Sequence, residues 1–370
     1  ETNNFSAPRL IVGITVDQLR TDYLYALQSR FSQGGFRRLM REGVIYDQVV
    51  YDLDNPDATA AMATLATGCY PYLNGISSQF VFDVQTLQRH SVFQDWDFKG
   101  TETAGNWSPR ALQSSTLGDE LKLASQLRSK VFSIAPNAEQ ALIGAGHAGN
   151  SAIWFDEKTE RWASSTFYHE FPAVAVRQNL QPKEVLFCNL NTYIWNSSSI
   201  GNGADIIAPY QNISPVFSHR FIDKGKPNYA WAKTSPVINN AIAQLAQQLI
   251  HHSRMGLAGS SDMLQLTFYA GVYQHDKQET YPVELQEAYI NLDYTLEQLF
   301  EFIDKEIGLK NTFIYLMGTG ATDDNISDVP GISTGEFNAN RCTALLNSHL
   351  IALHGQGQWI EGFNHGQIYL

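Results

Sequence analysis

Apolar runs alternate with helical patterns of apolar residues along most of this 370-residue chain. Residues 10–16 form a continuous apolar run that ends in Asp17, which is typical of a buried parallel strand with a polar residue at its carboxyl end. Similar patterns predict, in chain order, a helix and a second strand in 34–52, a helix capped by Ser115 or Thr116 and then a strand in 114–135, a strand in 261–274, a helix in 283–308 and a strand in 311–322. This alternation predicts an α/β fold with a mostly parallel sheet.

Polar or irregular turns follow several of the predicted strands. A parallel sheet places ligand sites outside the carboxyl ends of its strands, so we expect four turns to gather at that edge: those at Asp17, Ala58, Val272–Asp276 and Thr319–Gly320. The turn at Ala58 lies in YDLDNPDATAAMATLATGCYP (51–71), a polar loop that leads into a helix of small residues. Such a helix start is typical of the position of a catalytic nucleophile, yet its slot holds an alanine.

Residues 151–239 break the alternation, because they are rich in Trp, Tyr, Asn, Ser and Pro. We interpret them as an inserted, aromatic-rich cap within a single domain that spans residues 1–370. Exposed aromatic rings stack on sugars. Trp154, Trp162, Phe167 and Tyr168 in this segment therefore raise the hypothesis of a glycan-binding module.

Charge and cysteine usage narrow the classes of partner and site. The net charge of −12 and the pI near 5.2 argue against nucleic acid or an anionic membrane surface as a partner. No apolar run approaches the roughly 18 residues that span a bilayer, so we expect no transmembrane segment. The three cysteines, Cys69, Cys188 and Cys342, exclude a disulfide scaffold and a cysteine-based zinc site; they leave room for one disulfide, which the sequence does not place.

The first residues, ETNNFSAPR, lack an initiator methionine and lead directly into the first predicted strand. This start is typical of a mature end left by removal of a signal peptide, or of an artificial boundary. We therefore expect an exported protein.

Longer motifs carry a family resemblance through nearly the whole chain. They are LIVGITVDQLRTDYL (10–24), GGFRRLMREGVIYD (34–47), ATLATGCYPYLNGI (63–76), AGHAGNSAIWFDEKTERWASSTFY (145–168) and GEFNANRCTALLNSHLIALHGQGQWIEGFNHGQIYL (335–370). With these motifs the sequence resembles the alkaline phosphatase superfamily, in particular its type I phosphodiesterase/nucleotide pyrophosphatase branch and the PafA-like bacterial phosphatases. The resemblance implies an alkaline-phosphatase-like sandwich, in which helices flank a mostly parallel central sheet, plus an inserted cap. It also implies a bacterial periplasm or cell surface as the location.

Enzymes of this family transfer phosphoryl groups with two zinc ions, ~4 Å apart, that hold the attacking and leaving oxygens. Asp and His side chains bind the metals. A Thr or Ser at a helix start attacks phosphorus, and positive or amide groups hold the remaining phosphoryl oxygens.

Carried over residue by residue, the resemblance leaves one position with its expected chemistry, because the first metal-binding Asp falls on Asp17. At the other positions the nucleophile falls on Ala58, the phosphoryl-binding Asn on Gln79, the Lys-x-Arg phosphate clamp on Asn137 and Glu139, the Asp-x-x-x-His metal pair on Val272 and Asp276, and the Asp-His dipeptide on Thr319 and Gly320. A last metal-binding His, which the family keeps in a further C-terminal segment, has no counterpart. A carboxylate in place of the clamp arginine repels a phosphate dianion.

These substitutions predict a pseudoenzyme, an alkaline-phosphatase-like fold without the catalytic set. We expect no bound cofactor, no small-molecule substrate, and a binding or scaffold role with another protein in a bacterial envelope complex. The alternative is an active zinc-dependent phosphomonoesterase or phosphodiesterase with a rearranged site. That site would use Asp17, Asp276, His275 and either Thr59 or a metal-bound water.

Overall fold

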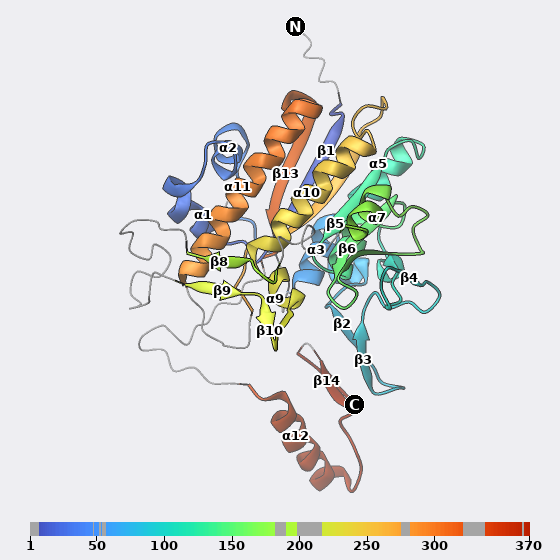
Figure 1. The fold of residues 1–370 in the computed structure, drawn as a ribbon. Helices are drawn as coiled ribbons and strands as arrows, with labels where there is room; N and C mark the ends of the chain where they lie inside the picture. Colours follow the sequence, from blue (N-terminus) through green and yellow to red (C-terminus); the bar gives the residue numbers. More distant parts are fainter. Residues whose placement is uncertain are drawn as a thin grey trace.

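A seven-stranded sheet forms the centre of the molecule, in the order β13-β1-β12-β5-β6-β7-β4 (Figure 1). The computed structural model describes residues 7–46, 48–51, 53, 57–181, 190–197, 217–274, 282–320, 337–364 and 366–370. The strands are β13 (Thr312–Gly318), β1 (Leu10–Asp17), β12 (Asp262–Tyr269), β5 (Val131–Ala135), β6 (Ser151–Asp156), β7 (Arg161–Ser165) and β4 (Gly100–Thr101). β13, β1, β12, β5 and β6 are mutually parallel, whereas β7 pairs antiparallel with both β6 and β4. The predicted α/β fold with a mostly parallel sheet is therefore confirmed.

The register of the central strands brings their carboxyl ends level. Asp17 of β1 pairs with Tyr269 of β12, and Val16 pairs with Gly318, so that Thr319 follows directly beside Asp17. Every residue of β12 is buried, including the polar Asp262, Gln265 and Thr267, because both faces of this central strand are covered.

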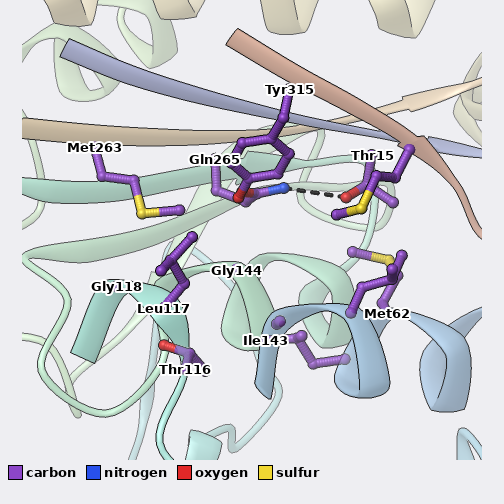
Figure 2. Close-up of a pocket in the computed structure, with 13 residues that line it drawn as sticks. Thr15, Met62, Thr116, Leu117, Gly118, Ile143, Gly144, Met263, Gln265 and Tyr315 are labelled. Atoms are coloured by element: carbon purple, nitrogen blue, oxygen red, sulfur yellow. Dashed lines mark hydrogen bonds between the residues drawn. The ribbon is translucent and has the colours of Figure 1, made fainter. Parts of the chain in front are cut away.

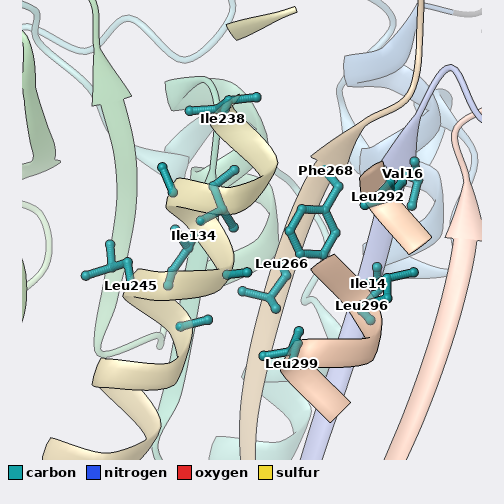
Figure 3. Close-up of a cluster of buried hydrophobic side chains, with 14 of the residues drawn as sticks. Ile14, Val16, Ile134, Ile238, Leu245, Leu266, Phe268, Leu292, Leu296 and Leu299 are labelled. Atoms are coloured by element: carbon teal, nitrogen blue, oxygen red, sulfur yellow. The ribbon is translucent and has the colours of Figure 1, made fainter. Parts of the chain in front are cut away.

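Helices cover both faces of the sheet. One face carries α7 (Ala173–Asn179), α10 (Pro236–His252) and α11 (Pro282–Glu306); the other carries α3 (Ala58–Thr67), α5 (Leu117–Ala124) and α6 (Ala138–Ala145). Figure 3 shows Leu292, Leu296 and Leu299 of α11 directed at the sheet, where Ile14 and Phe268 meet them. Their spacing of three and four residues puts the leucines on one helix face. Burial of these side chains contributes about 1.5–3 kcal/mol each before entropy is subtracted.

Smaller elements surround this core. They are α1 (Thr21–Leu27), η1 (Gln28–Arg30), α2 (Phe36–Glu42), α4 (Pro71–Asn74), β2 (Phe80–Asp83), β3 (Gln88–Ser91), η2 (Pro109–Ala111), β8 (Ile194–Asn196), β9 (Ser218–Arg220), β10 (Ile222–Asp223), β11 (Lys226–Pro227), α9 (Tyr229–Lys233), η3 (Leu309–Asn311), α12 (Ala339–His354), β14 (Gly362–Asn364) and β15 (Gln367–Tyr369). In Figure 1, α12 and β14 lie at the opposite end of the molecule from the N-terminus, near the β2–β3 hairpin. No helix in the described ranges is both long and apolar enough to cross a membrane.

Two features differ from the sequence-based expectation. The second strand expected in 34–52 does not form among the described residues of that segment, where α2 is followed by 44–46 and 48–51 without ladder pairing. Val44 and Val50 are 82% and 85% exposed. Apolar, β-branched residues predict a strand locally, but a strand also needs backbone pairing with a partner strand, and the described residues of this segment form none.

The 151–239 segment, expected as an inserted cap, starts inside the central sheet with β6 and β7. Trp154, Trp162 and Tyr168 are 3%, 0% and 6% exposed. The rings of these three residues therefore fill the core and are not free to stack on a sugar. Phe167 is partly buried and packs against the rings of Phe98 and Tyr168. The exposed aromatic face that the glycan-binding hypothesis needs is thus absent at Trp154, Trp162 and Tyr168. The division into one domain with a cap stays a prediction.

Candidate functional site

Asp17 and Thr319 meet at the carboxyl ends of β1 and β13. The Thr319 hydroxyl donates a 3.0 Å hydrogen bond to Asp17 Oδ1, and Gln140 Nε2 lies 3.4 Å from Asp17 Oδ2. Thr319 is fully buried and Asp17 is 9% exposed. Because a buried carboxylate needs donors, these neutral groups satisfy Asp17 where the family resemblance implies a metal ion.

The nucleophile position lies at the first residue of α3. Ala58 is half-buried there, directly after Asp57, which caps the helix. Asp57 Oδ1 accepts a 2.8 Å hydrogen bond from the Ala60 amide, and its Oδ2 accepts a 2.6 Å bond from the Gln79 amide. The helix start that the sequence predicts is therefore present, and it presents a methyl group. Thr59, the next residue, is 5% exposed, as expected for a side chain turned away from the Ala58 direction.

The two halves of the expected phosphate-binding set contact each other. Gln79 Nε2 lies 3.4 Å from Glu139 Oε1, and the Ser91 hydroxyl donates to the same oxygen at 3.0 Å. Glu139 is only 6% exposed. The Glu139 carboxylate therefore accepts the hydrogen bonds of the Gln79 and Ser91 side chains.

Asn137 belongs to a second polar group beside Glu139. Its Nδ2 lies 3.4 Å from Gln140 Oε1, and Lys233 Nζ donates to its Oδ1 at 3.2 Å. Lys233 also forms a 2.9 Å ion pair with Glu157. The charge of Lys233 is therefore already balanced by a neighbouring carboxylate, whereas Asp17, Asp57 and Glu139 contribute negative charge to the same edge of the sheet.

The loop after β12, on which the family resemblance places a metal-binding pair, contains no His, Cys, Asp or Glu among its described residues, 270–274. Val272 supplies a backbone carbonyl that accepts a 2.7 Å hydrogen bond from the Tyr269 hydroxyl. Asn239 of α10 brackets the Tyr269 backbone with a 2.7 Å bond to its carbonyl and a 2.9 Å bond from its amide. Asp276 and His275, which the rearranged-site alternative needs, lie outside the described residues.

Gly320 is packed under an aromatic ring. It has a φ of +70°, and a Cβ added there would lie 2.6 Å from the Tyr51 ring. The Tyr51 hydroxyl donates a 2.7 Å hydrogen bond to the Gly318 carbonyl, which holds the ring in place. Burial raises the pKa of Tyr51, so the hydroxyl stays a donor at neutral pH.

The described residues at these positions do not fit a dinuclear zinc centre. A catalytic zinc takes three protein ligands from His, Asp, Glu or Cys. In the described parts of the chain, no three or more such side chains gather closely enough to hold a metal ion. Thr319, Gly320 and Val272 offer no ligand that zinc prefers, and Asp17 is engaged by neutral donors.

A pocket lies between the sheet and the helices α3, α5 and α6 (Figure 2). Met62, Met263 and Met317 contribute to its apolar wall. At its polar side, Gln265 Nε2 donates to Thr15 Oγ1 at 3.1 Å and the Tyr315 hydroxyl donates to Gln265 Oε1 at 2.8 Å. None of the described side chains lining it is charged or is a His or Cys. It is therefore suited neither to a phosphate group nor to a metal ion.

Sequence reasoning missed several residues that build this site. Asp57 had a usable signal, because an Asp directly before a run of helix formers is a typical N-cap. No local pattern indicated the roles of Gln140, Ser91 and Tyr51. Each of them forms a hydrogen bond with a residue that is distant in the sequence. Cys69 and Cys342 are free, and Cys188 lies outside the described residues.

A comparison with models of known protein families shows to which family this chain belongs. The model of the type I phosphodiesterase/nucleotide pyrophosphatase family matches residues 11–357. The chain belongs to this family. It thus retains the family's sheet and turns while carrying Ala58, Glu139 and Gly320 at the positions described above.

Individual proteins with similar sequences are alkaline phosphatases. The alkaline phosphatase PhoV of Synechococcus elongatus is 28% identical over 94% of this chain and 64% of its own length. The alkaline phosphatase PafA of Elizabethkingia meningoseptica is 27% identical over 85% of this chain and 60% of its own length. The chain therefore spans less than two thirds of either of these relatives.

A solved structure shares the fold. The crystal structure of wild-type alkaline phosphatase PafA superposes with a TM-score of 0.83 at 24% identity and covers 99% of this chain and 73% of that protein. The expected alkaline-phosphatase-like architecture, with helices flanking a mostly parallel central sheet, is confirmed. Because the sequence identity is low, the superposition shows only that the two proteins share a fold.

Proposed function

We propose that this chain is a catalytically inactive member of its family that acts by binding, as a scaffold component of a bacterial envelope complex. The observation that carries the proposal is the methyl group of Ala58 at the first residue of α3. A phosphoryl transfer through a covalent intermediate needs a nucleophile at that place. A methyl group supplies none.

Charge supports the same proposal. Glu139 replaces a positive clamp residue, and Asp17 and Asp57 lie at the same edge of the sheet. Like charges disfavour a phosphate dianion in such a site. The resemblance to PafA-like phosphatases supports a location in the bacterial periplasm or at the cell surface, where we expect the partner protein.

Turnover and metal content test the inactivity. The purified chain would be incubated with zinc, dialysed, analysed by plasma mass spectrometry and assayed with p-nitrophenyl phosphate and bis-p-nitrophenyl phosphate. We expect less than stoichiometric zinc and hydrolysis no faster than the blank, with the PafA phosphatase as a positive control. Stoichiometric zinc with turnover that a chelator abolishes would overturn the proposal. That result would favour a zinc-dependent phosphomonoesterase or phosphodiesterase with a rearranged site.

Native size tests the binding role. Envelope extracts of the source bacterium would be separated by native electrophoresis and probed with an antibody against the chain. We expect a species larger than the purified chain, found in the periplasmic or membrane fraction. Migration identical to that of the purified chain, or recovery in the cytoplasmic fraction only, would count against a complex of the envelope.

A further inference from the structure

Two hydrogen-bond donors converge on one carboxylate oxygen in the interior of the protein. The Ser91 hydroxyl lies 3.0 Å and the Gln79 side-chain amide 3.4 Å from Glu139 Oε1. Glu139 is 6% and Ser91 is 8% exposed. Gln79 and Ser91 lie at the base of the β2–β3 hairpin and Glu139 lies in α6, so this arrangement depends on the packing of the hairpin against that helix.

The printed partners of the Glu139 carboxylate are neutral donors, without a basic side chain among them. Glu139 lies in the first turn of α6, where the free amides of a helix start carry partial positive charge. No described Lys, Arg or His forms an ion pair with Glu139; the nearby Lys233 is paired with Glu157. An anion held by neutral donors and a helix start is a known solution for phosphate and carboxylate binding.

Gln79 also connects Glu139 to the start of α3. Its backbone amide donates to Asp57, the residue that caps α3 next to Ala58, while its side chain reaches Glu139. The carboxylate is therefore joined through one residue to the turn that holds the nucleophile position.

We propose that Glu139 is a built-in anion that fills an anion-binding pocket formed by the side chains of Gln79 and Ser91, beside the first turn of α6. This inference deepens the proposed function, on which it rests, because it names what excludes phosphate from the site. The side-chain donors of Gln79 and Ser91 converge on this point, and a tethered carboxylate occupies them. Removal of that carboxylate opens a space of matching chemistry for a small free carboxylate such as formate.

Chemical rescue by formate tests this. The melting temperatures of the full chain and of Glu139→Ala would be measured in increasing sodium formate, with sodium chloride at equal ionic strength as the reference. We expect Glu139→Ala to melt lower than the unchanged protein and to gain on the order of 2–5 °C in formate, in a saturable manner. The unchanged protein should respond to formate and chloride alike.

Two variants serve as controls. Glu120→Ala deletes the same side chain from the first turn of α5, where the carboxylate is exposed, and should gain nothing from formate. Glu139→Gln keeps the volume of the side chain, leaves no space for formate and should not respond either. Equal responses of Glu139→Ala and Glu120→Ala would overturn the proposal.

If Glu139→Ala does not fold, its refolding yield from urea with and without formate gives the answer. A formate-dependent yield supports the pocket, and equal yields contradict it. The outcome is independent of the turnover assay above. A chain that hydrolyses phosphate esters refutes the proposed function, whereas an inactive chain without formate rescue refutes the built-in anion alone.

Discussion

Thr319 donates a hydrogen bond to Asp17 across the ends of two neighbouring parallel strands, at 3.0 Å and shielded from solvent. The hydroxyl also accepts a 3.3 Å bond from the Gln18 amide. One neutral side chain thus satisfies a buried carboxylate and a backbone group at once. These contacts join the ends of β1 and β13 directly, at the Asp17 position to which the family resemblance assigns a metal ligand.

Substitution of Thr319 by valine tests that connection. Thr319→Val keeps the shape and removes the donor, which leaves Asp17 short of a partner in the interior. We expect a loss of about 1–3 kcal/mol in the free energy of unfolding, measured by urea denaturation. Thr319→Ser retains the hydroxyl and should lose clearly less. Equal stability of the valine variant and the unchanged protein would show that the hydrogen bond contributes nothing.

Gly320 should tolerate no side chain. Gly320→Ala combines a left-handed backbone, at φ +70°, with a Cβ 2.6 Å from the Tyr51 ring. We expect a loss of about 1–3 kcal/mol in the free energy of unfolding. Gly225→Ala is the matched control, because Gly225 has φ +80° with open space around it and meets only the backbone penalty. If the two variants lose the same amount, the packing of Tyr51 is irrelevant.

Restoration of the nucleophile alone should not restore catalysis. Ala58→Thr places a hydroxyl at the first residue of α3, but a threonine hydroxyl is a weak nucleophile without a metal or a base to deprotonate it. We expect hydrolysis of bis-p-nitrophenyl phosphate to stay within twofold of the blank in the presence of zinc. A zinc-dependent rise of tenfold or more in this variant would show that a metal site exists after all.

Stability should decrease from pH 6 to pH 8 through His147. Its Nδ1 lies 3.3 Å from Asp119 Oδ2 and its Nε2 lies 3.0 Å from the Leu112 carbonyl, so only the protonated ring can donate to both. The hydrogen bond with Asp119 raises the pKa of His147, against the opposing effect of burial. His147 therefore binds its proton more tightly in the folded chain. Its contribution is complete below the unfolded pKa of about 6.5 and is lost as the pH rises through the folded pKa.

The magnitude of this effect is small, because the His147 side chain is 36% exposed and solvent screens the pair. We expect less than about 1 kcal/mol between pH 5.5 and 8.5, measured as the change in the urea midpoint. Asp119 does not add to it, because its pKa is lowered: burial acts to raise it, but the hydrogen bonds from His147, Thr116 and Ala148 outweigh burial. His147→Gln should flatten the profile; a variant with the same slope as the unchanged protein would exclude His147 as the source.

Local patterns predicted the framework well. The apolar run that ends in Asp17 became β1, and Thr116, one of two expected caps, begins α5 with a reciprocal bond to Asp119. Such features depend on neighbours within a few residues. The 44–51 segment shows the limit, because its strand pattern is equally clear and no described strand pairs with it.

The sequence predicted which positions form the candidate site but not the hydrogen bonds between their side chains. The sequence indicated that Asp17 and Thr319 gather at one edge, but their hydrogen bond joins residues 302 apart. The contact of Gln79 with Glu139 likewise depends on how the β2–β3 hairpin packs against α6. Side-chain partners at such separation follow from tertiary packing, which no local pattern contains.

The ring of Tyr51 over Gly320 has a consequence for any attempt to rebuild the site. A histidine at position 320 is incompatible with Tyr51 in its place, because even its first side-chain carbon would overlap the ring. Introducing the Asp-His dipeptide that the family resemblance implies therefore also requires a change at position 51. That change would remove the hydrogen bond from the Tyr51 hydroxyl to the Gly318 carbonyl at the end of β13.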